Sequence, residues 1–480
     1  MTTTKPSAVP LFVLVFSTLL GCAAPRRSSP DEPRPEPEAA RRAGARSGAA
    51  PVAAFDPLAD GVLTLGEALA LASRHPEVVL ARAEVAVADA RVTIAETYPH
   101  DPAVKLKAST DAAFEDEGEG ERTVALSQTI ETGGGLAHRA ASARASRRAA
   151  VFDLEALEWR ARAAVTDAYY DLLAADEGVR LADRRREIAM RLVEIAETRL
   201  RAADVSAIDA NLVRASGRET EAAATTAARE RRAASLRLAR LLSLAPRDDL
   251  VLEGALPSPV RVEPGPLERV ALRTRREILS AIAEREAARA SADAARASRW
   301  PDVTVELFYT RDTSVFDVGP DSFTDRGDIL GLGVEIPLPV FGRGKGERQE
   351  ALADAARASE RLEIAAADFR SEIRDAANRA AAAADLVALY ERDLVVLARE
   401  TRSLVSEAFR LGEVGAAEVL RAREEEARID EGDLAARLEA ARAIVALERA
   451  IGASLEDAMR EASSEEEEAK ERKEKEEERP

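Results

Sequence analysis

Residues 63–243 and 266–452 of this chain have the same order of expected elements, and this duplication constrains the fold more than any other feature. Each copy is predicted to form a helix, two short alternating strands, a very long helix, a tight turn and a returning helix. The later parts align at a constant offset, which places Val205 on Val414. The expected elements are 64–97, 102–110, 122–131, 136–203 and 207–242 in the first copy, and 266–299, 302–310, 329–338, 344–411 and 416–451 in the second.

The long helices decide what kind of packing the chain needs. A helix over 136–203 would extend on the order of 100 Å at about 1.5 Å per residue. The two shorter helices of each copy, placed end to end, would be as long as the long helix beside them. Such rods need neighbours along their whole length. The sequence therefore predicts side-by-side helices, and the aromatic content of 4 % is in keeping with walls rich in small residues.

A seven-residue spacing runs along both long helices and indicates supercoiled neighbours. Small residues at these positions allow the helix axes to approach closely. The same spacing fits an ordinary coiled-coil dimer equally well, so it does not decide the architecture alone. The positions are Ala161, Ala168, Ala175, Ala182, Ala189, Ala196 and Ala203 in the first copy, and Ile373, Ala380, Val387, Leu394, Thr401 and Ala408 in the second.

Each predicted strand alternates apolar and polar residues. Val104 and Leu106, for example, alternate with Lys105 and Lys107. Segments of this length with one apolar face fit the tilted strands of a membrane barrel, and they also fit a half-buried soluble hairpin. A soluble hairpin must bury its apolar face, and the helices of this chain already bury one another. The barrel is therefore the favoured interpretation.

A four-stranded set cannot close a barrel, and open strand edges are not tolerated in lipid. Two chains would supply eight strands, and three chains would supply twelve strands around an open lumen. We favour the trimer. The predicted fold class is thus mainly α with a small transmembrane β part: a 12-strand β-barrel continued by a 12-helix tunnel, with each protomer an internal duplication.

The first residues are similar to a bacterial lipoprotein signal. The apolar run from Ala8 to Leu20 is too short to span a membrane, and Leu19-Leu20-Gly21-Cys22 resembles a lipobox. Cys22 is the only cysteine in the sequence. We expect residues 1–21 to be a signal peptide and Cys22 to carry a lipid such as palmitate; the alternative is a plain signal peptide with Cys22 a bystander. The remaining expected segments are a flexible linker at 22–62, a linker at 244–265 and a charged tail at 453–480, which contains a helical or disordered stretch from 461.

Several motifs, in order and duplicated over 63–455, resemble TolC-type outer-membrane efflux channels. Leu63-Thr64-Leu65-Gly66-Glu67-Ala68, followed by His75-Pro76-Glu77, is similar to the opening helix of that family. Ser127-Gln128-Thr129-Ile130-Glu131-Thr132-Gly133-Gly134 and Ile336-Pro337-Leu338-Pro339-Val340-Phe341-Gly342-Arg343-Gly344 are similar to its two strand-to-helix corners, the second most of all to heavy-metal efflux members. Phe409-Arg410-Leu411-Gly412-Glu413-Val414 is similar to its helical tip.

The resemblance implies a homotrimer in the outer membrane, lipid-anchored, with its helical tunnel in the periplasm. It also implies two partners, a periplasmic adaptor and an inner-membrane pump of the RND type. The tips at Ala203, Asp204, Val205 and Ser206 and at Gly412, Glu413, Val414 and Gly415 would meet the adaptor; the alternative is that they are plain turns. Gly412 and Gly415 suit a tight turn, whereas the first tip lacks glycine and is expected to turn less sharply.

The resemblance further places an aperture near Asp209 and Glu418. One inward carboxylate per chain would form a ring of like charges that selects cations. The second acid of the family pattern, three residues on, is Arg421 here, so a Glu418–Arg421 network is an alternative to an acidic gate. An ordinary solvated or intersubunit pair is a third interpretation.

No enzyme class is indicated. His75, His100 and His138 are dispersed, no Cys/His cluster has metal-ligand spacing, and we expect no cofactor or bound metal. The net charge of −18 argues against a nucleic-acid partner. The favoured function is the passive outer-membrane channel of a tripartite efflux system, with metal cations favoured over drugs as cargo. The alternatives are a periplasmic lipoprotein scaffold without a pore and the exit duct of a type I protein secretion system.

Overall fold

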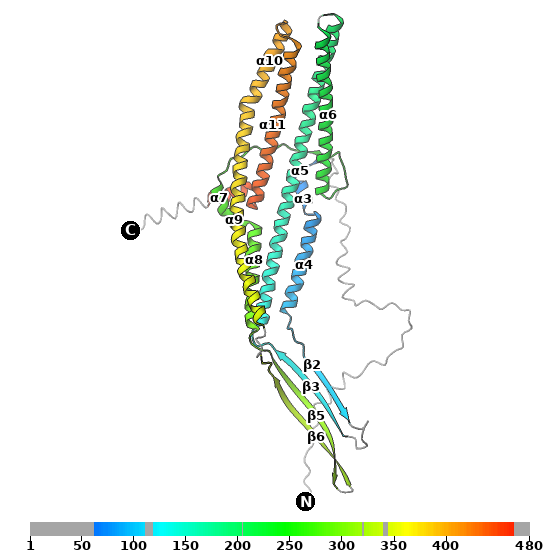
Figure 1. The fold of residues 1–480 in the computed structure, drawn as a ribbon, viewed down its shortest axis with the longest axis vertical. Helices are drawn as coiled ribbons and strands as arrows, with labels where there is room; N and C mark the ends of the chain where they lie inside the picture. The colour runs from blue at the N-terminus through cyan, green and yellow to red at the C-terminus, as the bar shows by residue number, and fades with distance from the viewer. Residues whose placement is uncertain (1–61, 111–118, 204, 319–320, 339–343, 465–480) are drawn as a thin grey trace, which may run out of the picture. The chain divides into compact units, whose positions relative to one another are not determined.

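The computed structural model describes residues 62–110, 119–203, 205–318, 321–338 and 344–464, all within one unit that runs from Asp60 onwards. Cys22, the expected signal peptide 1–21, nearly all of the linker 22–62, Asp204, residues 339–343 of the second corner and the tail beyond 464 lie outside the described residues. The helices lie side by side, and the strands extend from one end of them (Figure 1).

The predicted helix 64–97 is two helices. Thr64 caps the first, because its hydroxyl accepts the Glu67 N–H while the Glu67 carboxylate accepts the Thr64 N–H. His75 then leaves the helical conformation, since the residue before a proline avoids it, and Pro76 starts the next helix. The helices of this half are α3 (Leu65–Ala72), α4 (Pro76–Glu96), α5 (Gly135–Arg201) and α6 (Ala207–Leu241).

The predicted helix 266–299 is also divided, at the extended residue Arg275. The long helix 344–411 contains a π-helical segment, where the Tyr390 ring packs so closely on Gly432 that a Cβ there would overlap it. The helices of this half are α7 (Pro264–Thr274), α8 (Arg276–Ala297), α9 (Lys345–Leu389), η1 (Tyr390–Leu394), α10 (Val395–Leu411) and α11 (Ala416–Ile451).

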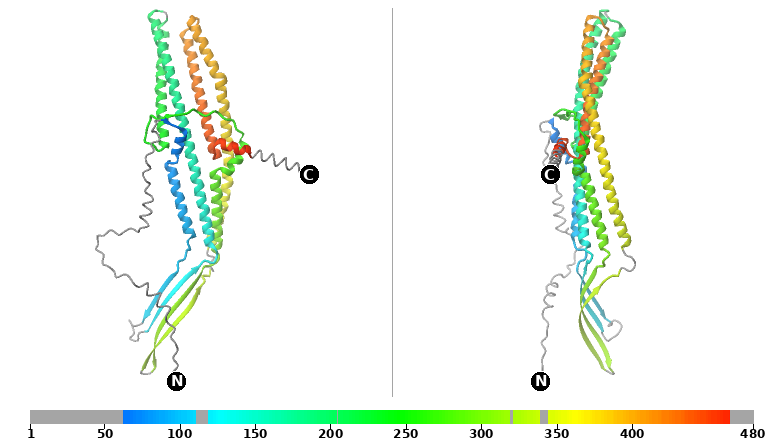
Figure 2. Two further views of the ribbon diagram at one scale, coloured as in Figure 1. Left: turned by 180° about the vertical axis from the view of Figure 1, so that it is seen from behind. Right: turned by 90° about the vertical axis from the view of Figure 1, so that its left-hand side faces the viewer.

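The order of neighbouring helices differs between the two halves of the rods. Near the strands, α5 contacts α4 and α8, and α8 contacts α9. In the other half, α5 contacts α6 and α11, and α11 contacts α10 (Figure 2). Each half is therefore a row of four helices. One row has α4 and α9 at its edges, and the other has α6 at one edge and, at the other edge, the continuous rod of α9 and α10, since α9 also contacts α11.

Small residues fill the space between these helices, as the seven-residue spacing predicted. Along α5, Val165, Ala168, Leu172 and Ala182 are buried. A core cluster joins α7, α9 and α11 and continues onto the segment after α11. It is built mainly from alanines with Leu267, Val270, Ile373, Val387, Leu447 and Ile451.

The sequence missed a short parallel pair at mid-length, formed by β1 (Val62–Leu63) and β4 (Val251–Leu252). It packs on α5, where the buried Tyr169 hydroxyl lies 2.9 Å from the Leu63 carbonyl oxygen and 2.5 Å from that of Glu253. The expected linker 244–265 is thereby attached to the helices.

The remaining strands form one antiparallel sheet in the order β2-β3-β5-β6. Two of them are longer than predicted at the end away from the helices, because pairing continues to Val318 opposite Asp321. The strands are β2 (Ala103–Thr110), β3 (Gly120–Ile130), β5 (Val303–Val318) and β6 (Asp321–Glu335).

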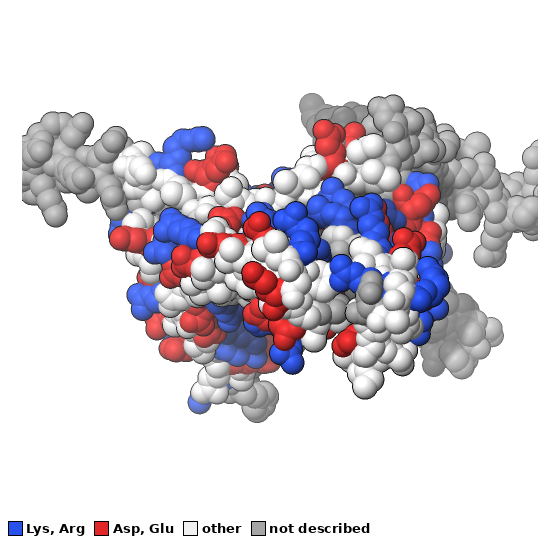
Figure 3. All heavy atoms as spheres, turned by 90° about the horizontal axis from the view of Figure 1, so that it is seen from above, with Lys and Arg blue, Asp and Glu red and all other residues white. Residues whose placement is uncertain are grey.

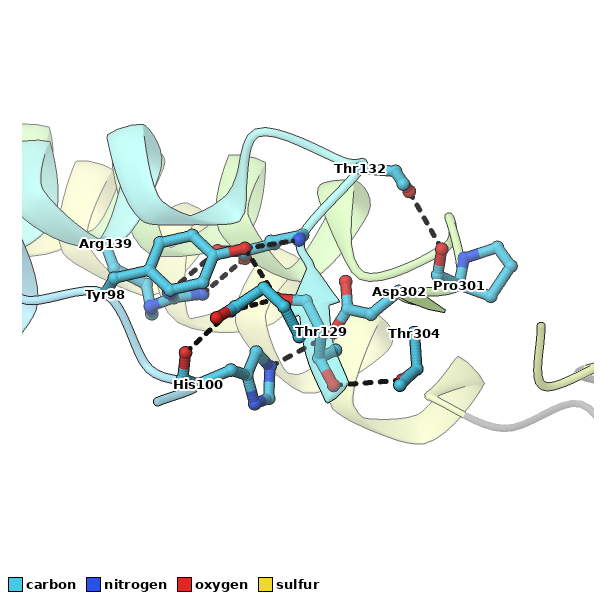
Figure 4. A network of polar contacts seen from close by, with 10 residues as sticks. Tyr98, His100, Thr129, Thr132, Arg139, Pro301, Asp302 and Thr304 are labelled. Carbon is cyan, nitrogen blue, oxygen red and sulfur yellow. Dashed lines mark hydrogen bonds and ion pairs between the residues drawn. The ribbon is translucent and has the colours of Figure 1, made fainter. Parts of the chain in front are cut away.

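A network of polar contacts joins the sheet to the helices (Figure 4). The Tyr98 hydroxyl accepts the Glu131 N–H at 2.8 Å and donates to the Thr129 carbonyl oxygen at 3.0 Å. The Thr132 hydroxyl donates to the Pro301 carbonyl oxygen at 2.8 Å, which ties the first corner to the second half of the chain. Further contacts are Arg139 with Glu131, Thr129 with Thr304, and His100 with Asp302.

Candidate functional site

The first helical tip turns without glycine. Helix α5 ends at Arg201 and α6 begins at Ala207, and between them Ala203 adopts a left-handed conformation with φ of 60°. For an L-residue such as alanine, this conformation costs about 1–2 kcal/mol of free energy relative to the right-handed one. Ser206 caps α6, since its oxygen accepts the Asp209 N–H at 3.1 Å and its hydroxyl donates to the Asp209 carboxylate at 2.7 Å. The turn spans 202–206, one residue more than the second tip.

The second tip, 412–415, uses glycine where the first uses alanine. Gly412 ends α10 with φ of 79°, and the Glu413 N–H donates back to the Ala408 carbonyl at 2.9 Å. Gly415 caps α11 with extended backbone, and a Cβ there would lie 3.2 Å from the Glu418 carboxylate. Viewed from the tip end, acidic and basic side chains are interspersed (Figure 3). Both tips project at the end of the rods farthest from the sheet (Figure 1).

The three residues expected at an aperture have different surroundings. Helices α5 and α6 form one helical hairpin, and α10 and α11 form a second. Asp209 is half-buried and lines a small cleft between these two hairpins. Glu418 and Arg421 are exposed, and neither forms an ion pair with the side chains that the structure describes. A Glu418–Arg421 contact is thus not seen within one protomer, and the role of all three residues stays a prediction.

The tips of the two hairpins meet at an aromatic contact. The guanidinium of Arg199 on α5 lies over the ring of Phe409 on α10, 5.0 Å from the ring centre. Apolar residues complete the cleft around this contact, among them Leu192, Val213 and Val419. The two hairpins of one protomer are therefore held together at their ends.

A second, charged cleft of about 740 Å³ lies between the same hairpins. Arg402 of α10 forms an ion pair of 3.0 Å with Glu426 of α11, and Arg423 lines the same cleft. Burial raises the pKa of the Glu426 carboxyl, and burial lowers the pKa of Arg423. Arginines and acids thus face one another between the two hairpins.

One face of the sheet is apolar across all four strands. Cross-strand register aligns apolar residues from both halves of the chain into continuous rows, and every member of these rows is exposed. Lys105 and Glu306, on the other face, form an ion pair of 2.6 Å between β2 and β5. The two apolar rows that cross all four strands are Val104–Leu126–Leu307–Leu332 and Leu106–Val124–Tyr309–Leu330.

Comparison with known proteins finds a family match in the second half of the chain. The family described as "Outer membrane efflux protein" matches residues 267–453. The match covers less than half of the chain. This match and the similar structures below confirm the predicted resemblance to outer-membrane efflux channels.

A curated relative shares sequence with half of this chain. The cobalt-zinc-cadmium resistance protein CzcC of Cupriavidus metallidurans is 27 % identical over 239 residues, which are 50 % of this chain and 54 % of the relative. The match therefore spans about half the length of each protein.

Solved outer-membrane channels share the fold. A structure of CusC matches with a TM-score of 0.68 and 16 % identity, covering 81 % of this chain and 92 % of that one. The outer-membrane channel OprN matches with a TM-score of 0.65 and 21 % identity, covering 81 % and 90 %. The outer membrane protein VceC of Vibrio cholerae matches with a TM-score of 0.66 and 18 % identity, covering 81 % and 96 %. The predicted fold class is confirmed by these structures, which are described as a transmembrane channel, an outer-membrane channel and an outer membrane protein.

Among the helices that the structure describes, none is sufficiently long and apolar to cross a bilayer.

The helices also hold a charge cluster that sequence reasoning missed, in which the two acids of α5 are partly buried. Asp167 of α5 has a buried carboxylate oxygen without a hydrogen-bond partner among the described residues. Burial, reinforced by the nearby Asp171, raises the pKa of Asp167 to about 6. Asp171 is itself held by Arg237 of α6 at 3.0 Å and Arg442 of α11 at 2.6 Å. The only sequence signal was a pair of acids one turn apart on an alanine-rich helix.

Proposed function

We propose that this protein is the channel subunit of a tripartite efflux system, and that three copies enclose a passive duct across the outer membrane. The observation that carries the proposal is the set of apolar rows that crosses all four strands. A sheet with one exposed apolar face and one polar face matches the wall of a barrel that has lipid outside and water inside. Exposed aromatic residues lie toward both ends of the apolar rows, as in membrane barrels: Tyr98 and Trp300 near the helices, and Tyr309 in the last apolar row toward the strand ends.

The unpaired edges support an oligomer. β2 and β6 each have one neighbour in the sheet, and edge strands cannot face lipid unpaired. The edge helices carry exposed apolar residues on both sides of the protomer, which would become buried against further copies. These residues include Leu80 and Ile94 on α4, Ile208 on α6, Ile364 on α9, and Leu397 and Leu404 on α10. Three copies would close both the strands and the helices into one tube.

The tips are the proposed adaptor contacts. They lie at the far end from the sheet, and a periplasmic adaptor joined to an inner-membrane pump of the RND type would meet them there. The duct needs no energy source of its own, because the pump supplies it. Lipid anchoring at Cys22 rests on the lipobox resemblance and would keep the protein at the outer membrane.

Divalent metal cations are the proposed cargo. The similarity to a cobalt-zinc-cadmium resistance protein supports this choice. The polar face of the sheet adds a physical reason, because its outer rows carry Glu121, Asp312 and Asp325. Carboxylates around a mouth favour cations over anions.

The first experiment tests the channel with the full-length protein purified from outer membranes. Heat-resistant trimers and stepwise, cation-selective conductance in planar bilayers are expected. A monomer that remains soluble without detergent after delipidation would contradict the proposal and would favour a periplasmic scaffold.

A second experiment tests the cargo. Cells that lack the gene should become sensitive to cobalt, zinc or cadmium, and the intact gene should restore resistance. Unchanged metal sensitivity together with new sensitivity to dyes or antibiotics would support the proposed channel but contradict metal cations as its cargo. The Cys22→Ser variant should lose incorporation of labelled palmitate, whereas incorporation into this variant would contradict the proposed anchor.

A further inference from the structure

The apolar face of the sheet becomes basic just beyond its last apolar row. The next row toward the strand ends is Ala108–Arg122–Arg311–Asp328, and the row after it contains Arg326 opposite Thr313. Because residues two apart on a strand share a face, all these side chains lie on the same face as the apolar rows. Three arginines and one aspartate therefore border the apolar rows.

The single aspartate does not neutralise the three arginines. Asp328 accepts from Arg311 at 2.7 Å and from the Tyr309 hydroxyl at 2.8 Å. Arg122 and Arg326 are exposed, and neither has an ion-pair partner among the described side chains. Directly opposite residues on neighbouring strands lie about 5 Å apart, so the Arg122 and Arg311 side chains can reach a common ligand.

The opposite face has the opposite charge at the same level. Glu121 and Asp312 are direct partners there, and the Thr123 hydroxyl donates to Glu121 on that face. Asp325 is one row farther out, opposite Ser314. Acids thus gather on the polar face and arginines on the apolar face, so the arginines are specific to the side that would meet lipid.

We propose that Arg122, Arg311 and Arg326 form a binding site for the phosphate of an anionic lipid headgroup in the membrane leaflet farthest from the helices. This inference rests on the proposed barrel. A guanidinium presents a fork of N–H donors that matches two phosphate oxygens. Basic residues at the margin of a bilayer attract anionic headgroups, and Tyr309 sits where interfacial aromatic residues of barrels are found. The site would fix the depth of the barrel in the membrane.

Lipid selection by purified full-length trimers tests the site. The trimers are placed in nanodiscs made of equal amounts of phosphatidylcholine and phosphatidic acid, and the lipids that stay bound on extraction are counted by native mass spectrometry. Wild-type trimers should retain phosphatidic acid in excess. The double variant R122Q/R326Q leaves the Arg311–Asp328 pair intact. The excess of phosphatidic acid that it retains should be lower than the wild-type excess by about fivefold for each arginine removed. Asp328→Asn should raise the excess, because it frees Arg311.

Lys107→Gln is the matched control. Lys107 lies on β2 at the same level but on the other face, opposite Thr123, so this variant should retain the wild-type excess. An unchanged excess in R122Q/R326Q, or an equal fall in K107Q, would overturn the site. Displacement of phosphatidic acid by inorganic phosphate at equal concentration would show a site for free phosphate and would overturn the lipid assignment.

Conductance measurements on the same samples distinguish failure of the lipid site from failure of the proposed channel. If wild-type and variant trimers conduct alike while lipid retention is unchanged by R122Q/R326Q, the lipid site is refuted and the channel stands. If wild-type protein neither inserts nor conducts, the proposed channel fails and the lipid site fails with it.

Discussion

The Arg199 guanidinium lies 5.0 Å from the centre of the Phe409 ring, and this contact links the tips of two helical hairpins from different halves of the chain. Arg199 is near the end of α5, two residues before its last residue, and Phe409 is in the last turn of α10. Contacts of this kind contribute about 0.5–2 kcal/mol. If the two tips moved apart, the Arg199–Phe409 contact would have to break.

Phe409→Ala should therefore widen the tip end of the channel. The expected result is higher single-channel conductance and greater leak of large antibiotics into cells. Phe409→Leu preserves apolar contacts but removes the aromatic ring, so its conductance should lie between wild type and alanine. Equal conductance of all three proteins would show that the contact does not restrict the tips.

Glu418→Gln should reduce cation selectivity if the exposed carboxylates at the start of α11 form a ring in the trimer. Each replacement removes one negative charge per protomer, so the reversal potential in a salt gradient should move toward zero. Glu424→Gln, also exposed on α11, is the control and should leave the reversal potential nearer the wild-type value. A larger effect of the control than of Glu418→Gln would place the aperture elsewhere.

Asp167→Asn should stabilise the protein at neutral pH. Its folded pKa of about 6 lies above the ordinary carboxyl value of 3.8, so the folded state binds the proton more tightly than the unfolded state. The resulting destabilisation is present above pH 6 and disappears as the pH falls through the interval from 6 to 3.8. The melting temperature of the variant should exceed that of wild type by roughly 2 °C at pH 7.5, and the difference should vanish near pH 4.

The exposed Asp183, also on α5, supplies the control for this pH dependence. Asp183→Asn should change the melting temperature by an amount that varies little between these pH values. A difference for Asp167→Asn that is likewise constant with pH would contradict the raised pKa.

Arg275→Met should destabilise the junction of α7 and α8. The buried guanidinium forms an ion pair of 2.8 Å with Glu372, lies 3.7 Å from the centre of the Phe369 ring and donates to the Ala450 carbonyl at 2.7 Å. Loss of a buried charged hydrogen-bonding group costs about 3 kcal/mol. Thermal unfolding measures the effect, and Arg296→Met, at an exposed i,i+3 ion pair, should cost less than about 1 kcal/mol. A similar loss of stability in the two variants would contradict the proposed role of the buried Arg275 guanidinium.

Val104→Arg should impair membrane assembly. Val104 lies in the apolar row that is farther from the arginines, and an arginine facing the middle of a bilayer from a barrel costs about 2–4 kcal/mol. Heat-resistant trimers in the outer membrane should decrease. Ser109→Arg, on the polar face of the same strand, should assemble normally, and equal assembly of both variants would argue against lipid on the apolar face.

Local patterns in the sequence were sufficient for the repeated elements. Alternation along Val104–Lys107 depends on neighbours in the chain, and so it shows a strand with one apolar face before any partner is known. The seven-residue spacing predicted close helix neighbours in the same way. Ser206 and Gly412 mark helix ends through short-range hydrogen bonding and backbone conformation, which are also local.

Contacts between distant residues decided the rest. The pairing of β1 with β4 joins Val62 to Val251, the unpartnered Asp167 lies among arginines of α6 and α11, and Arg275 meets Phe369 on another helix. The alignment of Leu106 with Tyr309, which makes a continuous apolar row, requires the registers of two strand pairs. By itself the sequence determined which elements form and which faces are apolar, because these follow from short-range periodicity. Only the tertiary structure decided which charges meet and how the rows align, because burial and register depend on partners more than a hundred residues away.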